Sequence, residues 1–317
     1  MAAARRVAFT RGACKNPAVS SLRFAALVAG LVTSFVTAGA CYKQGPAPAP
    51  GAPSADVEER LRRVEQILAR NAEALEFLQK VYDSQKKQAD AEADREPAPG
   101  AVFGVAIDQN VAAGLVDGPP ALVTVVKAFD FACPYCERSS PILSELVKEY
   151  RGKVRVVYMD RIVHEFAEPA HLAGCAAGKQ GKYLAFKTAF WEKGFGPYVA
   201  SRGRDRSGFE ADGLVAIAQA VQLDIGRFKS DMASRACTEL LAHQRVELDK
   251  FKVDGTPTFF INGIYIAGGL DKDGLKAVID DRLRAAEASG VPAAQYYDRE
   301  ILGKGEKKFR SKRDSKP

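Results

Sequence analysis

The sequence predicts a mixed α/β fold preceded by a long amphipathic helix, and three observations point to it. Apolar residues between Val57 and Tyr82 recur at alternating intervals of four and three, which is the period of a helical heptad. Two apolar runs flank a C-x-x-C and a segment of helical length, as a strand–helix–strand unit requires. A further pair of apolar runs at residues 258–267 is joined by Asn-Gly, a common hairpin turn.

The N-terminal 40 residues are predicted to be a signal peptide. They hold five basic residues and no acid, and residues 24–40 carry no charge. That uncharged stretch is also close to the length of a membrane anchor that stays uncleaved. The residues before Cys41 resemble a bacterial lipobox, so we expect Cys41 to carry lipid and to hold the protein on the periplasmic side of a cell envelope. An exposed thiol on a flexible tail is the alternative for Cys41.

Residues 41–56 are rich in Pro and Ala and are expected to form a tether. Residues 57–92 are expected to form a coiled-coil helix, and residues 57–82 carry its seam. The apolar stripe is wider than a minimal dimer needs, which favours a homo-oligomer such as a trimer. The alternative is a lone amphipathic helix that packs on the chain's own domain. The seam residues are Val57, Leu61, Val64, Leu68, Asn71, Leu75, Leu78 and Tyr82.

The rest of the chain alternates apolar runs with helical patterns. A helix from Pro134 to about Tyr150 separates two buried strands, residues 161–251 are mainly helical, and a closing helix covers residues 271–288. The predicted strands are residues 102–107, 122–128, 153–159, 258–261 and 265–267. Residues 290–317 form a basic tail, and we expect its part after Lys304 to be solvated and disordered. The alternative is weak attachment of this part to anionic lipid or envelope polymer.

The formal net charge of +7 does not indicate a nucleic-acid partner. The excess lies in the first 40 residues and in residues 304–317, which hold seven basic and two acidic side chains. The part between these ends is slightly acidic. A nucleic-acid interface normally appears as a basic stripe across the folded domain, so no nucleic acid is expected as a partner.

The motif Cys133-Pro134-Tyr135-Cys136 stands at a predicted junction of strand and helix. Cys133 falls near the helix N-terminus, where free amide N–H groups and the helix dipole stabilise a thiolate, so its pKa should be lowered. Cys136 follows one turn later, within reach for a disulfide. Stabilising the thiolate makes that disulfide more oxidising. The motif therefore predicts redox chemistry at these two sulfurs.

A metal site is the competing interpretation of this motif. Structural zinc needs about four ligands, and the chain has no second C-x-x-C. The three histidines lack ligand spacing and are expected to be ordinary surface or hydrogen-bonded residues: His164, His171 and His243. No metal or other cofactor is therefore expected.

The dipeptide Thr256-Pro257 enters the predicted hairpin. An X-Pro bond has only a small preference for trans, so a fold can hold it cis. A cis Pro257 that faces the C-x-x-C would leave the Thr256 backbone free to pair with an extended substrate. The alternative is a trans proline that begins a strand.

Three segments together resemble the DsbA-like branch of the thioredoxin superfamily: FDFACPYC at residues 129–136, GKQGKY at residues 178–183 and GTPTFFING at residues 255–263. The resemblance covers residues 101–289. It implies a thioredoxin core formed by residues 101–160 and 252–289, with residues 161–251 as a helical insertion.

The resemblance also implies roles for individual residues. Cys133 is the attacking cysteine, Cys136 resolves, and Pro257 is cis. Pro134, Tyr135 and Thr256 are expected to contact substrate. Relatives sometimes carry a second, non-catalytic disulfide in the insertion, here Cys175 with Cys237, and two buried free thiols are the alternative.

One position departs from the family pattern. Relatives often have an acidic residue six positions before the first cysteine, where it assists proton transfer of the resolving thiol. Here that position is Lys127. We expect a basic residue there to favour the thiolate instead.

The sequence therefore predicts an exported thiol-disulfide oxidoreductase that acts through a mixed disulfide at Cys133, as an oxidase, an isomerase or a reductase. Its partners would be proteins with thiols or disulfides and a membrane or periplasmic redox partner. The alternative is a membrane-tethered scaffold with a thioredoxin fold that binds partners without turnover.

Overall fold

The computed structural model describes residues 54–315. The predicted signal peptide, Cys41 and nearly all of the predicted tether lie outside these residues. Of the helices between residues 54 and 315, none combines the length and the hydropathy needed to cross a membrane. The chain divides after Arg70 into two units, and each is described by itself.

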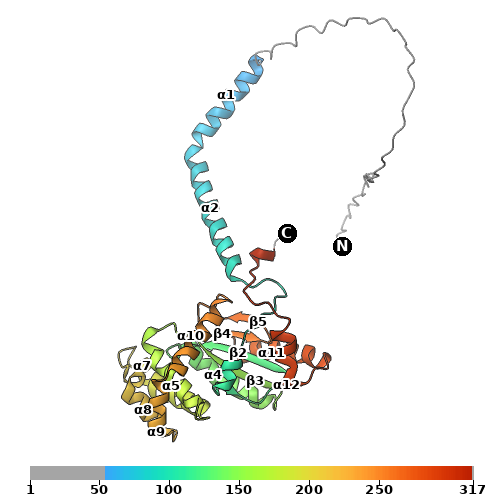
Figure 1. The fold of residues 1–317 in the computed structure, drawn as a ribbon. Helices are drawn as coiled ribbons and strands as arrows, with labels where there is room; N and C mark the ends of the chain where they lie inside the picture. The colour runs from blue at the N-terminus through green and yellow to red at the C-terminus, as the bar shows by residue number, and fades with distance from the viewer. Residues whose placement is uncertain (1–53, 316–317) are drawn as a thin grey trace, which may run out of the picture. The chain divides into compact units, whose positions relative to one another are not determined.

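The heptad segment forms two helices, α1 (Ala55–Arg70) and α2 (Ala72–Arg95) (Figure 1). A turn at Asn71 separates them, so the single helix expected over residues 57–92 is interrupted. Asn favours caps and turns over helix interiors, which explains the position of the break. Neither helix buries a side chain. The seam residues Leu61 and Leu75 are 57% and 48% exposed.

The sheet has five strands in the order β1-β3-β2-β4-β5. Only β2 and β3 are parallel to each other, and both are buried along their whole length, as their continuous apolar sequences predict. The β4–β5 hairpin turns through Asn262 and Gly263, which both have positive φ. The strands are β1 (Val116–Asp117), β2 (Val123–Phe129), β3 (Val154–Asp160), β4 (Thr258–Ile261) and β5 (Ile264–Ala267).

The strand expected at residues 102–107 is wrong. The segment buries Phe103, Val105 and Ile107 but joins no strand ladder; its one bridge pairs Phe103 with Glu306. The alternation of buried and less buried residues thus arises from packing without sheet hydrogen bonds. A short helix, α3 (Asp108–Ala112), follows it.

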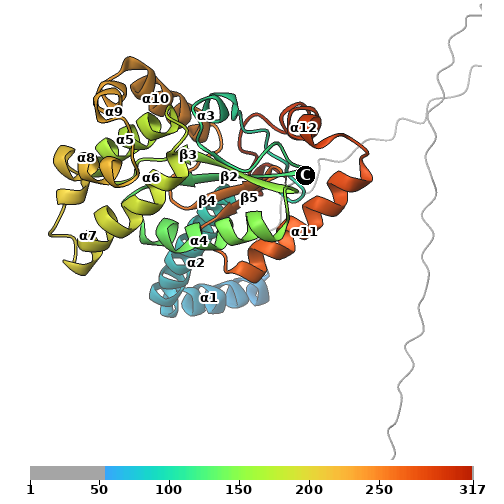
Figure 2. The same ribbon diagram turned by 90° about the horizontal axis from the view of Figure 1, so that it is seen from below.

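Helices cover both faces of the sheet (Figure 2). On one face, α4 (Pro134–Glu149) and α11 (Lys272–Ala288) pack over alternate strand residues such as Val125 and Val156. On the other face, residues such as Val126 and Val157 pack against the end of α10 (Arg235–Asp249), the segment before α3 and the C-terminal region. The first face carries the C-x-x-C.

The chain between β3 and β4 is helical. An aromatic cluster that includes Phe131, Phe186, Phe190 and Trp191 forms its interior, and Phe131 reaches this cluster from the loop before Cys133. The remaining α-helices of this part are α5 (Glu168–Gly178), α6 (Tyr183–Phe190), α7 (Gly196–Ala200), α8 (Ala211–Ala220) and α9 (Ile225–Met232). The loop before Cys133 is therefore anchored by the inserted helices.

The expectation of a disordered tail after Lys304 is wrong for the described residues, which end at Ser315. Helix α12 (Ala293–Tyr296) and a π-helical turn at Tyr297–Leu302 precede a segment that runs back along the domain. Phe309 stacks on Phe103, with ring centroids 5.5 Å apart. Arg313 pairs with Asp94 at the end of α2, at 2.9 Å. A count of charges did not indicate that Phe309 packs on Phe103 or that Arg313 pairs with Asp94.

Candidate active site

The C-x-x-C occupies the start of α4. Cys133 is the N-cap residue, Pro134 fills the first turn, and the Cys133 carbonyl oxygen accepts hydrogen bonds from the N–H groups of Cys136 and Glu137. Proline fits this place because the first helical N–H groups need no partner within the helix. The end of β2 and the start of α4 thus place Cys133 at the positive end of the helix dipole.

The second predicted element lies directly beside this sulfur. The Thr256–Pro257 peptide bond is cis, and Cys133 Sγ lies 3.3 Å from the Thr256 carbonyl oxygen. Residues more than 120 positions apart in the chain therefore meet, because β4 pairs with β2.

Both thiols are buried, with Cys133 4% and Cys136 0% exposed, but they differ in acidity. The hydrogen bond from the Cys136 thiol is the largest influence that lowers the pKa of Cys133, to about 6. The Thr256 side chain and the backbone N–H groups of Cys136 and Tyr135 add to this effect, while burial opposes it. Burial raises the pKa of Cys136 well above its ordinary value, and the hydrogen bond to Cys133 adds to the rise. Cys133 is therefore the thiol that ionises near neutral pH.

The flanking residues offer an exposed surface at the sulfur. Pro134 and Tyr135 are exposed, and the Tyr135 ring lies 4.8 Å from the Arg138 guanidinium carbon. Thr256 is half-buried and Pro257 is buried. The residues expected to contact substrate thus surround Cys133, while Cys136 is fully buried behind it.

Lys127 is fully buried in β2, on the inner side of α4. Its Nζ donates to the Cys136 carbonyl oxygen at 2.9 Å and to Ser140 Oγ at 3.2 Å. The Lys127 charge does lower the pKa of Cys136, as expected, but burial outweighs it. Lys127 thus favours the Cys136 thiolate, but its charge does not offset the effect of burial.

Asp130 fixes the loop before Cys133 through hydrogen bonds to backbone N–H groups. It was not identified from the sequence as a site residue. Its buried carboxylate accepts hydrogen bonds from the N–H groups of Ala132, Val163 and His164, at 2.7–2.8 Å. Burial would raise the pKa of Asp130, but its hydrogen bond and charge interaction with His171 and these N–H groups lower it. The only sequence signal was an acidic residue directly after a buried strand.

Two of the three histidines lie beside carboxylates, whereas the buried Nδ1 of His243 has no hydrogen-bond partner among the described residues. His171 is buried with Nδ1 2.6 Å from Asp160 Oδ1, and His164 Nδ1 lies 3.1 Å from Asp130. Between residues 54 and 315, no group of three or more His, Cys, Asp or Glu side chains is arranged to hold a metal ion.

Cys175 in α5 and Cys237 in α10 lie 1.93 Å apart at their sulfurs, as a disulfide, with 62 positions between them in the chain. This bond lies within the inserted helices. Cys133 and Cys136 are both free thiols in the structure.

Comparison with known proteins shows which family the chain matches. The family model described as thioredoxin matches residues 109–281, more than half of the chain. The Na(+)/H(+) antiporter NhaA 1 of Salinispora arenicola is 36% identical over 168 residues, which are 52% of this chain and 24% of the antiporter. The chain thus spans about a quarter of the length of that relative.

The chain is also similar to a further relative and to two solved structures. The probable disulfide bond formation protein D of Bacillus cereus is 27% identical over 196 residues, 60% of this chain and 86% of that protein. A thioredoxin-like oxidoreductase from Silicibacter pomeroyi has 29% identity and a TM-score of 0.45, covering 57% of this chain and 97% of the other. BdbD from Bacillus subtilis has 19% identity and a TM-score of 0.46. The match covers 60% of this chain and 99% of BdbD.

The family match spans the sheet, the C-x-x-C helix and the inserted helices between β3 and β4. The chain therefore belongs to the thioredoxin family.

Proposed function

We propose that the protein is an exported thiol-disulfide oxidoreductase that exchanges disulfides with substrate proteins through a mixed disulfide at Cys133. One observation carries the proposal: an acidic thiol at the N-terminus of α4 lies 3.3 Å from the backbone of a cis Thr256–Pro257 bond. A thiolate attacks disulfides, whereas a protonated thiol does not. The adjacent Thr256 backbone gives an extended substrate a place to pair.

The exchange takes two steps. In the reducing direction, the Cys133 thiolate attacks a substrate disulfide, and one substrate sulfur leaves as a thiolate. Cys136 then loses its proton and attacks Cys133, so that a Cys133–Cys136 disulfide forms and the second substrate sulfur leaves. In the oxidising direction the same steps run in reverse, and electrons pass from the substrate thiols to the disulfide.

The low pKa of Cys133 supports an oxidising role. A stabilised thiolate makes the reduced form more favourable and the disulfide a stronger oxidant. The name of the Bacillus cereus relative refers to disulfide bond formation, which agrees with that direction. We therefore propose an oxidase or an oligomeric isomerase, with a membrane or periplasmic redox partner that resets the Cys133–Cys136 pair.

Two activity assays test the proposal. The protein should catalyse insulin reduction in the presence of dithiothreitol or the recovery of active ribonuclease from its scrambled form. Cys133→Ala should abolish both activities, because the attacking sulfur is gone. Absence of both activities in the unaltered protein would contradict the proposal and favour a scaffold that binds partners without turnover.

The oligomer and the location are part of the same proposal. The exposed seam of α1 and α2 supports association of copies of this chain, with a shared cleft as the consequence. The basic, acid-free N-terminus and the lipobox-like residues before Cys41 support export and lipid attachment at Cys41. The disulfide in the inserted helices agrees with an oxidising compartment.

A further inference from the structure

A buried imidazole lies against the loop that leads into the C-x-x-C. His171 belongs to α5 and is fully buried. Its ring packs against the rings of Phe129 and Phe131, with centroids 5.5 and 5.0 Å apart. These two residues stand on either side of Asp130 in the chain, so the imidazole contacts the segment that connects β2 with Cys133.

Both ring nitrogens of His171 face a carboxylate. Nδ1 lies 2.6 Å from Asp160 Oδ1 at the end of β3, and Nε2 lies 3.6 Å from Asp130 Oδ1. Burial favours the neutral ring, but the charge of Asp160, hydrogen bonds to both carboxylates and the charge of Asp130 raise the pKa of His171 to about 9. At neutral pH the ring is therefore a buried cation that bridges two buried carboxylates.

The bridge reaches the loop in either protonation state. The protonated ring directs its Nε2–H toward Asp130, whereas a neutral ring with its proton on Nδ1 can accept a hydrogen bond from the Phe131 N–H, which lies 3.3 Å from Nε2. In both cases Nδ1–H donates to Asp160. The imidazole thus ties β3 to residues 130–131.

Asp130 passes this contact on to both cysteines. Its carbonyl oxygen accepts a hydrogen bond from the Cys133 N–H at 3.1 Å. Burial dominates the pKa of Cys136 and raises it, and a hydrogen bond from the backbone N–H of Asp130 acts in the opposite direction. The Asp130 backbone therefore contacts the first cysteine through its amide and the second through its sulfur.

The acidity of Cys133 depends on how the two sulfurs are placed. The hydrogen bond from the Cys136 thiol is the largest influence that lowers the pKa of Cys133. A hydrogen bond weakens steeply when its distance or angle departs from the preferred range. A loop that could shift would therefore weaken this bond and make Cys133 a weaker acid.

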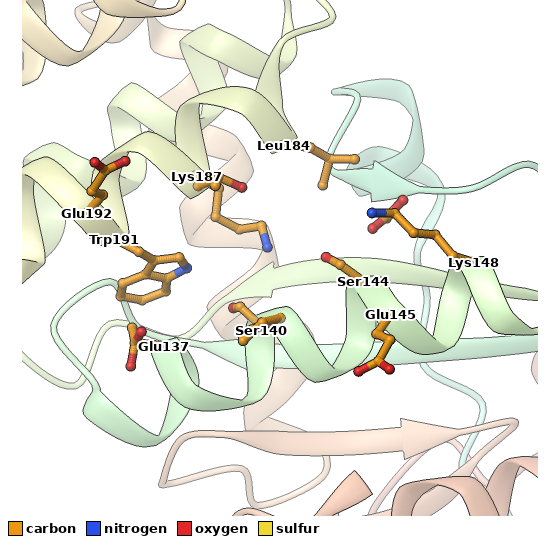
Figure 3. A pocket seen from close by; sticks show the side chains of 12 residues that line it. Glu137, Ser140, Ser144, Glu145, Lys148, Leu184, Lys187, Trp191 and Glu192 are labelled. Atoms are coloured by element: carbon orange, nitrogen blue, oxygen red, sulfur yellow. The ribbon is translucent and has the colours of Figure 1, made fainter.

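The inserted helices pack on the other side of the same loop. Phe131 contacts Phe190 and Trp191, with ring centroids 4.7 and 5.4 Å apart. Trp191 and Glu137 line one cavity of about 700 Å³, and Figure 3 shows the Trp191 ring beside the start of α4. Apolar contacts limit the displacement of Phe131 but have little directional preference. The contacts of His171 supply that direction, because hydrogen bonds depend on angle.

We propose that His171 is a positioning residue for disulfide exchange: held by Asp160, it fixes Asp130 and thereby keeps the Cys136 thiol in place to donate to Cys133. The inference deepens the proposed function and rests on it. His171 acts through Asp130 and makes or breaks no bond in the exchange. Its loss should therefore change the thiolate and the oxidising strength of the pair without abolishing exchange.

Three variants separate this role from a general contribution to the fold. His171→Leu removes the contacts of both ring nitrogens. Asp160→Asn keeps an acceptor for Nδ1–H but removes the charge that favours the protonated ring. The control is Leu248→Ala, because Leu248 is fully buried in the core on the opposite face of the sheet.

Three measurements are made on each protein. Thiolate absorbance at 240 nm in the reduced protein gives the pKa of Cys133. Equilibration with glutathione gives the oxidising strength of the Cys133–Cys136 pair, and urea unfolding gives the stability.

The pKa of Cys133 should rise by about one unit in His171→Leu, the size expected when a hydrogen bond to a thiolate is weakened. Asp160→Asn should raise this pKa by a smaller amount. The equilibrium with glutathione should shift several-fold toward the protein disulfide in both variants, because a less stable thiolate makes a weaker oxidant. Leu248→Ala should lower the free energy of unfolding and leave both redox measurements unchanged.

Different failures have different meanings. An unchanged pKa of Cys133 in His171→Leu, or an equal rise in Leu248→Ala, overturns the positioning role, while insulin reduction by the unaltered protein still supports disulfide exchange. If His171→Leu does not fold, an unchanged pKa of Cys133 in Asp160→Asn overturns the role. Absence of both insulin reduction and ribonuclease recovery in the unaltered protein contradicts the proposed function itself.

Discussion

Cys133 and Cys136 show how position alone gives two identical side chains opposite chemistry. Cys133 receives the hydrogen bond of the other thiol and sits where the helix N–H groups point. Cys136 is one turn deeper and fully buried, so that its charged form is disfavoured. The attacking and resolving roles proposed for the two sulfurs follow from this difference.

The low pKa of Cys133 predicts a pH-dependent stability of the reduced protein. The folded value is about 6 and the ordinary value is 9.0, so ionisation favours the folded state. The gain is absent below pH 6, grows between pH 6 and 9, and is full above pH 9. In urea unfolding, the free energy difference between the reduced protein and Cys133→Ala should grow over that range. A constant difference would contradict the lowered pKa.

For individual residues, the sequence predicted the features that depend on neighbours in the chain. It did not predict the features that depend on tertiary packing. The position of Cys133 at a helix start follows from an apolar strand and a proline at the next position. The hydrogen bond from Lys187 of α6 to the Tyr158 hydroxyl of β3 depends on tertiary packing, which no local pattern encodes. Two of the three backbone hydrogen bonds that Asp130 accepts depend on the chain returning at Val163 and His164.

Among the elements, α1 and α2 have an apolar seam that is exposed in the single chain. Leu75 and Leu78 are 48% and 59% exposed on α2, and burying such side chains contributes about 1.5–3 kcal/mol each. The heptad spacing predicted the helix and its seam, but the turn at Asn71 depends on one residue that favours non-helical conformations.

The seam predicts that copies of this chain associate. In analytical ultracentrifugation, residues 42–317 should sediment as a dimer or a trimer, and the double substitution Leu75→Glu with Leu78→Glu should give a monomer because it places charges in the seam. The control is Gln79→Glu, which adds a charge at an exposed position outside the seam. A monomeric mass for the unaltered protein would contradict the association.

The C-terminal segment is a second element with a structural role. Phe309 stacks on Phe103, and the Phe309 N–H donates to the Lys250 carbonyl oxygen at 2.8 Å. Sequence reasoning gave weight to the seven basic residues and not to the aromatic residue among them. A charge count does not detect a partner such as Asp94, which is 219 positions away from Arg313.

Loss of the Phe309 ring should destabilise the domain. Phe309 is half-buried, so Phe309→Ala should cost about 2 kcal/mol, below the range for fully buried rings. Urea unfolding checks this, with the exposed Lys308→Ala as the control. Equal stability of the two variants would show that the segment does not hold the domain together.

For the whole molecule, the disulfide ties two inserted helices that flank the core. It closes a loop of 62 positions between α5 and α10, which corresponds to about 4 kcal/mol in the chain-entropy account. The double substitution Cys175→Ser with Cys237→Ser should lower the free energy of unfolding by about this amount. Unchanged stability would contradict a structural role for the bond.

The mixed α/β fold could be predicted because the segments with helical or strand periodicity are long. The order of the strands in the sheet could not be predicted from these segments, because it depends on which strands pair. The meeting of Cys133 with Thr256 requires β4 to lie beside β2. Only the resemblance to a known family predicted that arrangement from the sequence. The inserted helices could be recognised as helical, but their packing around Phe131 could not.

The most direct test of the account is a titration of thiolate absorbance at 240 nm in the reduced protein. We predict one inflection near pH 6 that disappears in Cys133→Ala and remains in Cys136→Ser with a shift to higher pH, because the Cys136 hydrogen bond is weakened. Ionisation of Cys133 at the ordinary value near 9 would contradict the central claim, since the sulfur would then have no thiolate advantage at neutral pH.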